Sequence, residues 1–408
     1  MSLHSFAYDT QYKASVTNAT LGPFLDRIVP KFIRVRLASR VSRGSIQVGS
    51  EHGLSNFFVG FNIPGGGRGP QPNMGFVLID DQGNEFDAGI EAASMGFSAD
   101  VFEVYQFPAF PRRGKQLRLS FREVRADGSA GKALAEFSLP NPRPGPHQVW
   151  TPEPLPATRT AGDLAVTLTD FRTGLADEHL PDFAQKGVRT TVSQFTVLAG
   201  GRAEHAWRPR AVEVFDATGN HWEPPLIEES TKTDRQQTTL TFVGSLWPGE
   251  SAWKLRVEFS RVADFSSEEL WTLAHVQVPP PTEVSELKTS YEVNGTIGEM
   301  VAIGGTNAEL PGIFKPSTTK GQVNLAVRCD ARAQQKRLTL VRVLDDRDRA
   351  VVVTERFPDE AYRTFVLKVP ADSRELNFTF AVHRSRFVDF VARPEQVGRN
   401  LAGGAGHK

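Results

Sequence analysis

The segment Asp177-Glu178-His179, followed by Asp182, holds the densest set of potentially reactive side chains in this sequence. Carboxylates and an imidazole can bind a metal ion, or can act as acid and base in a hydrolytic reaction. The spacing matches neither a His-Glu-x-x-His helix nor an EF-hand loop. We therefore predict no metal and no cofactor. All four residues are the first candidates to test for a metal, and Asp177, Glu178 and His179 are the candidates for hydrolysis.

Two further acidic pairs, Asp80-Asp81 and Asp345-Asp346, stand where a predicted strand meets its turn. Clustered carboxylates in a loop are typical of calcium sites. An aspartate in this place also caps a turn by accepting hydrogen bonds from the backbone, which needs no ion. We predict capping, and Asp80 and Asp81 are the residues to test for calcium.

Residues 24–34 form the one segment with a clear helical pattern, because apolar side chains recur there on one side of a helical wheel. Arg27, Lys31 and Arg34 lie on the other side. We predict a short helical insertion near residues 22–43. It either covers the open end of a β core or rests its basic side on an anionic membrane surface, so these three residues are candidates for a membrane or partner surface.

Several catalytic and ligand-binding patterns are absent. The glycine-rich loop at 64–73 lacks the Gly-Lys-Ser/Thr ending of a phosphate-binding loop, and we predict a hairpin loop. There is no Gly-x-Ser-x-Gly motif, and the nine histidines are scattered. The single cysteine, Cys329, excludes an intrachain disulfide. Two carboxylates brought together by a β fold would leave no sequence pattern, so an enzyme stays open.

Composition favours a neutral, β-rich protein of several domains. Lys+Arg 47 equals Asp+Glu 47, whereas a nucleic-acid binder is expected to carry a basic surplus, so we predict no nucleic-acid partner. The 28 phenylalanines suit strands, and 408 residues suggest about three domains. The sequence shows no signal peptide and no transmembrane segment.

A strand pattern occurs three times, at Leu117–Phe121, Leu255–Phe259 and Leu376–Phe380. Each copy alternates apolar and polar side chains, as a half-buried strand does. Each follows a proline shortly before it and leads to a later strand that ends at a proline. We interpret the three copies as one repeat, although chance similarity among β segments is the alternative.

A strand and a turn precede each copy of the repeat. In the first two copies an aspartate is followed by Gly83-Asn84 or Gly219-Asn220, which is typical of hairpin turns because glycine and asparagine accept positive φ. In the third copy Asp348-Arg349 replaces Gly-Asn, and we expect a different turn there.

Five tryptophans fall between positions 207 and 271. On an exposed sheet face they could stack on sugar rings, whereas in a core they would pack. Trp253 lies two residues before Leu255, so we predict that it shares the inward face of that strand.

These patterns together predict an all-β protein of three tandem β-sandwich domains, with a short helical insertion in the first. The expected order is β-sandwich 1 at 1–139, a proline-rich linker at 140–154, β-sandwich 2 at 155–278, a proline linker at 279–283, β-sandwich 3 at 284–394 and a disordered tail at 395–408.

The segments His4–Gln11 and Phe110–Phe121, with the proline-closed last strands, resemble uncharacterised bacterial proteins built from tandem immunoglobulin-like β-sandwich domains. The resemblance implies an immunoglobulin-like fold and an exported or envelope-associated protein. The sequence departs from that pattern because it shows no export signal or anchor. The resemblance carries over no functional residues, since fold does not determine function.

The expected function is a non-catalytic binding or structural module, extracytoplasmic or at the cell envelope, with an unknown protein or glycan partner. One alternative is a carbohydrate-active or other hydrolytic enzyme with its site between domains, using Asp177, Glu178 and His179. The other is a peripheral membrane protein attached through the basic helix of residues 24–34. The oligomeric state cannot be predicted.

Overall fold

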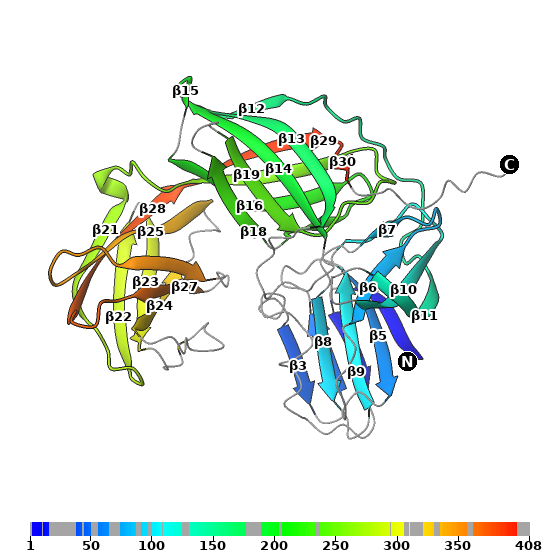
Figure 1. The fold of residues 1–408 in the computed structure, drawn as a ribbon, viewed down its shortest axis with the longest axis horizontal. Helices are drawn as coiled ribbons and strands as arrows, with labels where there is room; N and C mark the ends of the chain where they lie inside the picture. The colour runs from blue at the N-terminus through cyan, green and yellow to red at the C-terminus, as the bar shows by residue number, and fades with distance from the viewer. Residues whose placement is uncertain are drawn as a thin grey trace. The chain divides into compact units, whose positions relative to one another are not determined.

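The computed structural model of the chain is all-β and consists of several sheets, in which almost all strand pairs are antiparallel (Figure 1). Among the residues described, no helix is long and apolar enough to cross a membrane. The structure describes residues 2–9, 11–15, 38–42, 45–49, 56–64, 74–86, 91–96, 100–107, 109–124, 130–176, 189–203, 206–224, 226–232, 237–293, 295–305, 310, 321–329, 335–356 and 362–397.

The N-terminal part of the chain contributes three sheets. The first has the order β1 (Ser2–Asp9), β5 (Asn56–Pro64), β9 (Asp100–Phe107), β8 (Glu91–Gly96). The second has the order β11 (Ala130–Pro140), β10 (Gln116–Val124), β6 (Met74–Ile79), β7 (Glu85–Phe86). The third has the order β2 (Gln11–Ser15), β4 (Ser45–Gly49), β3 (Ala38–Ser42).

The middle of the chain contributes two sheets. One has the order β12 (Ala157–Ala161), β13 (Leu164–Ala176), β14 (Arg189–Ala199), β19 (Gln237–Val243), β18 (Leu226–Lys232), with β15 (Arg202–Ala203) on β14 and β30 (Glu395–Gln396) parallel to β13. The other has the order β17 (His221–Trp222), β16 (Trp207–Asp216), β20 (Trp253–Arg261), β29 (Arg386–Ala392). Phe195 of β14 and Phe390 of β29 lie with ring centroids 5.9 Å apart, so the two sheets share a core.

The C-terminal part contributes two more sheets. One has the order β21 (Leu270–Gln277), β28 (Glu375–Arg384), β25 (Lys336–Asp345), and the 3-10 helix η3 (Ser267–Glu269) precedes β21. The other has the order β22 (Val284–Val293), β23 (Thr296–Gly304), β24 (Gln322–Cys329), β27 (Tyr362–Lys368), β26 (Val352–Arg356).

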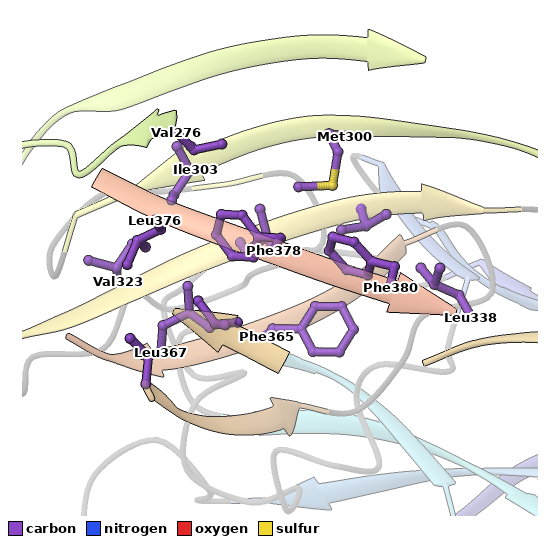
Figure 2. Packing of buried hydrophobic residues seen from close by; sticks show 14 of the residues in the cluster. Val276, Met300, Ile303, Val323, Leu338, Phe365, Leu367, Leu376, Phe378 and Phe380 are labelled. Carbon is purple, nitrogen blue, oxygen red and sulfur yellow. The ribbon is translucent and has the colours of Figure 1, made fainter. Parts of the chain in front are cut away.

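One hydrophobic core joins these last two sheets. Its buried side chains come from both, and Figure 2 shows Phe378 and Phe380 of β28 among residues of β23, β24 and β27. Phe380 lies 5.4 Å from Trp271 and 6.3 Å from Phe365 between ring centroids. Alternation along β28 directs Leu376, Phe378 and Phe380 to one side, as the repeat pattern predicted.

The three copies of the repeat occupy the same position in three sheets. β10 lies between β11 and β6, β20 lies between β29 and β16, and β28 lies between β21 and β25. In each case the strand before the acidic turn is one neighbour. The other neighbour is a strand that ends near a proline, at Pro140, Pro394 or Pro279.

The proline-closed strands do not pair in the order of the sequence. β21 follows β20 in the chain but pairs with β28, whereas β29 follows β28 after Ser385 alone and pairs with β20. Lys254 contacts Asp389 at 2.7 Å and Glu258 bonds to Ser385 at 2.6 Å, so β20 and β29 run antiparallel. They form a hairpin whose connection contains β21 to β28, whereas β10 ends at Val124 and its partner β11 begins at Ala130.

The contacts divide the chain into two compact units. Unit 1 comprises Met1–Ala203, Ala211–Val257 and Val388–Lys408, and unit 2 comprises Glu204–Arg210 and Glu258–Phe387. The return of the C-terminal segment to unit 1 agrees with the pairing of β29 with β20. The three-domain organisation stays a prediction.

Two expectations from the sequence need correction. The insertion near residues 22–43 was expected to be helical, but residues 38–42 form strand β3, paired with β4; residues 22–37 lie outside the described part of the chain. The tail was expected to be disordered from residue 395. Glu395 and Gln396 instead form β30, and Val397 donates a backbone hydrogen bond to Thr173 at 2.9 Å.

Candidate functional site

In the acidic turn of the first repeat, the side chain of Asp80 accepts hydrogen bonds from the backbone of the same turn. Asp80 Oδ1 accepts hydrogen bonds from the backbone N–H groups of Gln82 and Asn84, at 2.9 and 2.8 Å, and Oδ2 accepts from Asn84 Nδ2 at 2.8 Å. Gly83 adopts φ +78°, which a residue without Cβ tolerates. Asp81 accepts from the N–H groups of Lys115 and Gln116, at 2.6 and 3.1 Å. The turn therefore fastens the start of β10.

The turn of the second repeat has the same geometry but is buried. Asp216 Oδ1 accepts from the N–H groups of Thr218 and Asn220, at 2.9 and 3.0 Å, and from the Thr218 hydroxyl at 2.7 Å. Oδ2 accepts from Asn220 Nδ2 at 2.7 Å. Asn220 Nδ2 also donates to the carbonyl of Phe110 at 2.8 Å, and Asn220 Oδ1 accepts from the Phe110 N–H at 3.3 Å. The second turn thus binds the segment that precedes β10.

An ion pair supports this contact within unit 1. Arg113 donates from Nε and Nη2 to the two carboxylate oxygens of Glu250, both at 2.9 Å, and also to the carbonyl of Gln148 at 2.6 Å. Burial raises the pKa of Glu250, and the hydrogen bond from Arg113 only partly offsets this effect. Arg113, in the Phe110–Phe121 segment, therefore forms a bidentate ion pair that holds two parts of unit 1 together.

The third turn was expected to differ, and that expectation was wrong. Asp345 Oδ1 accepts from the N–H groups of Arg347 and Arg349, at 3.0 and 2.9 Å, and Oδ2 accepts from Arg349 Nε at 2.7 Å. The arginine Nε thus takes the place of the asparagine Nδ2. Asp348 adopts φ +57° where the other turns have glycine, because aspartate tolerates the left-handed region better than most residues.

The third turn gives a direct stability prediction. Asp348→Gly is expected to raise the free energy of unfolding of unit 2 by about 0.5–1 kcal/mol, because glycine accepts this positive φ without steric cost. Gly219→Ala, at φ +91° in the second turn, should instead lower the stability of unit 1 by about 1–2 kcal/mol. Urea denaturation of each variant measures both effects, and a destabilised Asp348→Gly protein would contradict the prediction.

The acidic residues considered for calcium thus hold backbone groups. Asp346 takes the role of Asp81 in the third copy and accepts from the N–H of Arg374 at 3.2 Å. Burial acts to raise the pKa of Asp345, but hydrogen bonds from Arg349, Ser373 and Arg347 outweigh it and hold the pKa well below its usual value. Over the described ranges, no group of three or more His, Cys, Asp or Glu residues is placed to hold a metal ion.

The other residues proposed from sequence lie outside the part of the chain that the structure describes. They are Asp177, Glu178, His179 and Asp182 of the acidic segment, and Arg27, Lys31 and Arg34 of the basic segment. Their assignments stay predictions.

The tryptophans of β17 to β20 pack in the interior of unit 1. Trp253 is fully buried, as predicted, with its ring centroid 4.6 Å from that of Trp247 and 5.7 Å from that of Trp222. In unit 2, Trp271 stacks on Tyr291 at 4.2 Å. The packing interpretation therefore holds for these four residues rather than sugar stacking on an open face.

A largely buried polar cluster lies in unit 2, and we name it the clamp. It consists of Glu258 and Ser260 of β20, Arg337 and Thr339 of β25, His383 of β28, and Ser385. His383 Nε2 lies 3.1 Å from Ser260 Oγ and 3.2 Å from Thr339 Oγ1. The carboxylate of Glu258 accepts from Ser385 Oγ at 2.6 Å and from Arg337 Nη1 at 3.1 Å.

The clamp contains a hydroxyl and an imidazole at the distance of a nucleophile and its base, but the rest of the geometry does not fit that chemistry. Ser260 and His383 are both fully buried. A base of this kind is oriented by a third group at its other nitrogen. Glu258 instead binds Ser385 and Arg337, and His383 Nδ1 makes no hydrogen bond within the described chain. The clamp is therefore built to hold strands together.

The environment of His383 keeps its ring neutral. Burial, with the positive charge of Arg261, lowers the pKa of His383 to about 4. The backbone of Arg384 and the carboxylate of Glu269 act in the opposite direction, and Arg337 lowers the pKa further. The ring of Phe265 covers the imidazole at 5.2 Å between centroids.

Sequence reasoning missed the clamp because its members are far apart in the chain. Ser260 and His383 are separated by 123 positions. Alternation along Leu255–Phe259 is typical of a half-buried strand, yet the polar residues Glu258 and Ser260 are both buried. The one available signal was a pair of polar residues two positions apart in each of the two segments, Glu258 with Ser260 and His383 with Ser385.

Comparison with known proteins adds no assignment to this geometry. No protein-family model matches the chain, and no curated protein matches it in sequence.

Proposed function

We propose that the protein is a non-catalytic binding or structural module built from immunoglobulin-like sandwiches and associated with the cell envelope. The observation that carries the proposal is that the same aspartate-capped turn occurs in all three repeats. In each repeat an aspartate holds its own turn through backbone N–H groups. Such turns stabilise a scaffold and leave recognition to the loops and sheet faces between them.

The polar side chains of the interior support the same proposal. Glu250 and Glu258, which are buried, each bind an arginine. The imidazole of His383 is enclosed by hydroxyl groups and an aromatic ring. These groups fix strands relative to one another, as the polar interior of a scaffold does. The envelope association rests on the resemblance of the sequence to tandem immunoglobulin-like proteins.

A combined binding and turnover screen tests the proposal. The full chain is applied to a glycan array and to an array of envelope proteins, and the same preparation is incubated with glycoside and ester substrates. We expect saturable binding to a glycan or protein without turnover.

Two other results would contradict the proposal, one its non-catalytic part and one its envelope part. Turnover of a glycoside or ester that is lost in Asp177→Ala, Glu178→Ala or His179→Ala would assign the hydrolytic alternative. Recovery of the native protein wholly in the cytosolic fraction would contradict the envelope part.

A further inference from the structure

The clamp ties together the two ends of the long segment of unit 2. Residues 258–387 enter the unit through β20 and leave it through the continuous run of β28, Ser385 and β29. Ser260 and His383 join these strands across 123 positions, and Glu258 and Ser385 join them across 127. Both hydrogen bonds join residues near the start of the segment to residues near its end, so they hold the two ends of the segment together.

The middle of the segment reinforces this closure. Arg337 and Thr339 of β25 reach the same two centres, since Arg337 donates to Glu258 and Thr339 lies beside His383. The side chains of Arg337 and Glu258 are only 14% and 10% exposed. Removing one partner of such a pair is strongly destabilising, because the other charge is left buried. The clamp is therefore coupled to the core of unit 2.

The neutral imidazole suits this enclosure and the charged imidazole does not. Nε2 faces two hydroxyl groups, which can donate to it or accept from it. In the imidazolium both nitrogens are donors. Nδ1 makes no well-formed hydrogen bond within the described chain, and the backbone of Arg384, which favours the charged ring, does not outweigh its burial. An unsatisfied buried donor costs free energy in addition to the desolvation of the charge.

The charged groups around His383 also make the charged imidazole unfavourable. Arg261 of β20 and Arg337 of β25 are positive, and Glu269 of η3 is the negative neighbour. Glu269 acts to raise the pKa of His383, but it is already bonded to Arg261, and Glu258 is bonded to Arg337, so the two carboxylates only partly balance a third positive charge. Proton binding is therefore favoured in the open state, where the ring meets water.

We propose that the clamp is an acid-sensitive latch, in which protonation of His383 in mild acid releases the two ends of residues 258–387 and opens unit 2. The sign follows from linkage. The open state binds the proton with the ordinary pKa near 6.5, and the closed state binds it only near 4. Closure is therefore fully favoured above pH 6.5 and weakens as the pH falls toward 4.

Amide hydrogen exchange of the full chain at pH 7.5 and pH 5.0, corrected for the intrinsic exchange rates, measures the opening. The opening constant of peptides from β25 and β28 should rise about 30-fold at pH 5.0, because each pH unit below 6.5 adds a factor of about 10. Peptides from β14 and β19 of unit 1 should change far less.

A matched pair of histidine variants separates the latch from general acid effects. His383→Gln should lose most of the 30-fold change, because glutamine does not take up a proton. His275→Gln should keep it, since His275 lies on β21 of the same unit with its side chain 80% exposed. Any effect of acid on other groups of unit 2 is expected to be the same in both variants.

A direct titration keeps the test decisive if His383→Gln does not fold. The NMR signal of the His383 ring in the native protein should show no protonation between pH 7.5 and the pH at which unit 2 opens. A ring that titrates near pH 6.5 in the closed state would overturn the proposal. So would a 30-fold change that survives in a folded His383→Gln protein.

Discussion

Trp253→Ala is expected to lower the free energy of unfolding of unit 1 by about 4 kcal/mol, which is the largest single effect that the structure predicts. The side chain is fully buried and packs edge-on against Trp247 and Trp222, and its loss would remove contacts with both rings. The rings of Trp222 and Trp247 cannot move far enough to fill the space that the indole leaves, so a cavity would remain. Guanidinium denaturation, followed by circular dichroism, measures the effect.

Two further measurements decide whether the effect comes from packing. Trp253→Phe keeps an aromatic ring and should cost about half as much as the alanine variant. Hydrogen exchange should locate the loss in unit 1, with β28 of unit 2 little affected, because separate cooperative units open separately. A loss below about 1 kcal/mol in Trp253→Ala would contradict the close packing of the three rings.

Asp216→Ala is expected to lower the stability of unit 1 by about 3 kcal/mol. The carboxylate is 2% exposed and accepts four hydrogen bonds, from the N–H and hydroxyl of Thr218 and the N–H and amide of Asn220. Alanine would leave buried N–H groups without an acceptor, which costs more than the bonds themselves contribute. It would also free the Asn220 side chain that holds Phe110.

The first repeat provides the control for this prediction. Asp80→Ala removes the same set of backbone bonds from a turn whose Gln82 and Gly83 are exposed. Water can replace the carboxylate there, so the expected loss is only about 1 kcal/mol. Equal losses in the two variants, measured by urea denaturation, would show that burial does not set the contribution of the aspartate.

The local architecture was predictable from the sequence because it depends on neighbouring residues. Alternation in Leu117–Phe121, Leu255–Phe259 and Leu376–Phe380 gave strands at the right places, and Trp253 faces inward as its spacing from Leu255 required. The third turn was misjudged because Asp348 and Arg349 reproduce by their own chemistry what glycine and asparagine do elsewhere.

The pairing of strands and the clamp were not predictable for a different reason. β21 and β29 are similar proline-closed strands, and nothing in either sequence states which repeat it will join. Contacts across more than a hundred positions depend on the whole fold rather than on local pattern. The same distance hides the clamp, since Ser260 and His383 meet only after β28 has returned to β20.

The hairpin of β20 and β29 has a consequence for how the chain folds. Its connection spans more than a hundred positions, whereas Val124 and Ala130 bracket the short connection between β10 and β11. Closing the longer loop in a disordered chain costs about 3 kcal/mol more, by the logarithmic dependence on loop length. That difference disappears once unit 2 is folded, because its two ends are then held beside each other at Ser260 and His383.

During synthesis β29 leaves the ribosome only after β21 to β28 have done so, and the edge of β20 that it covers stays open until then. An open strand edge can pair with another chain. Rapid folding of the inserted residues, before their host sheet is complete, would therefore shorten the interval in which this edge is exposed to aggregation.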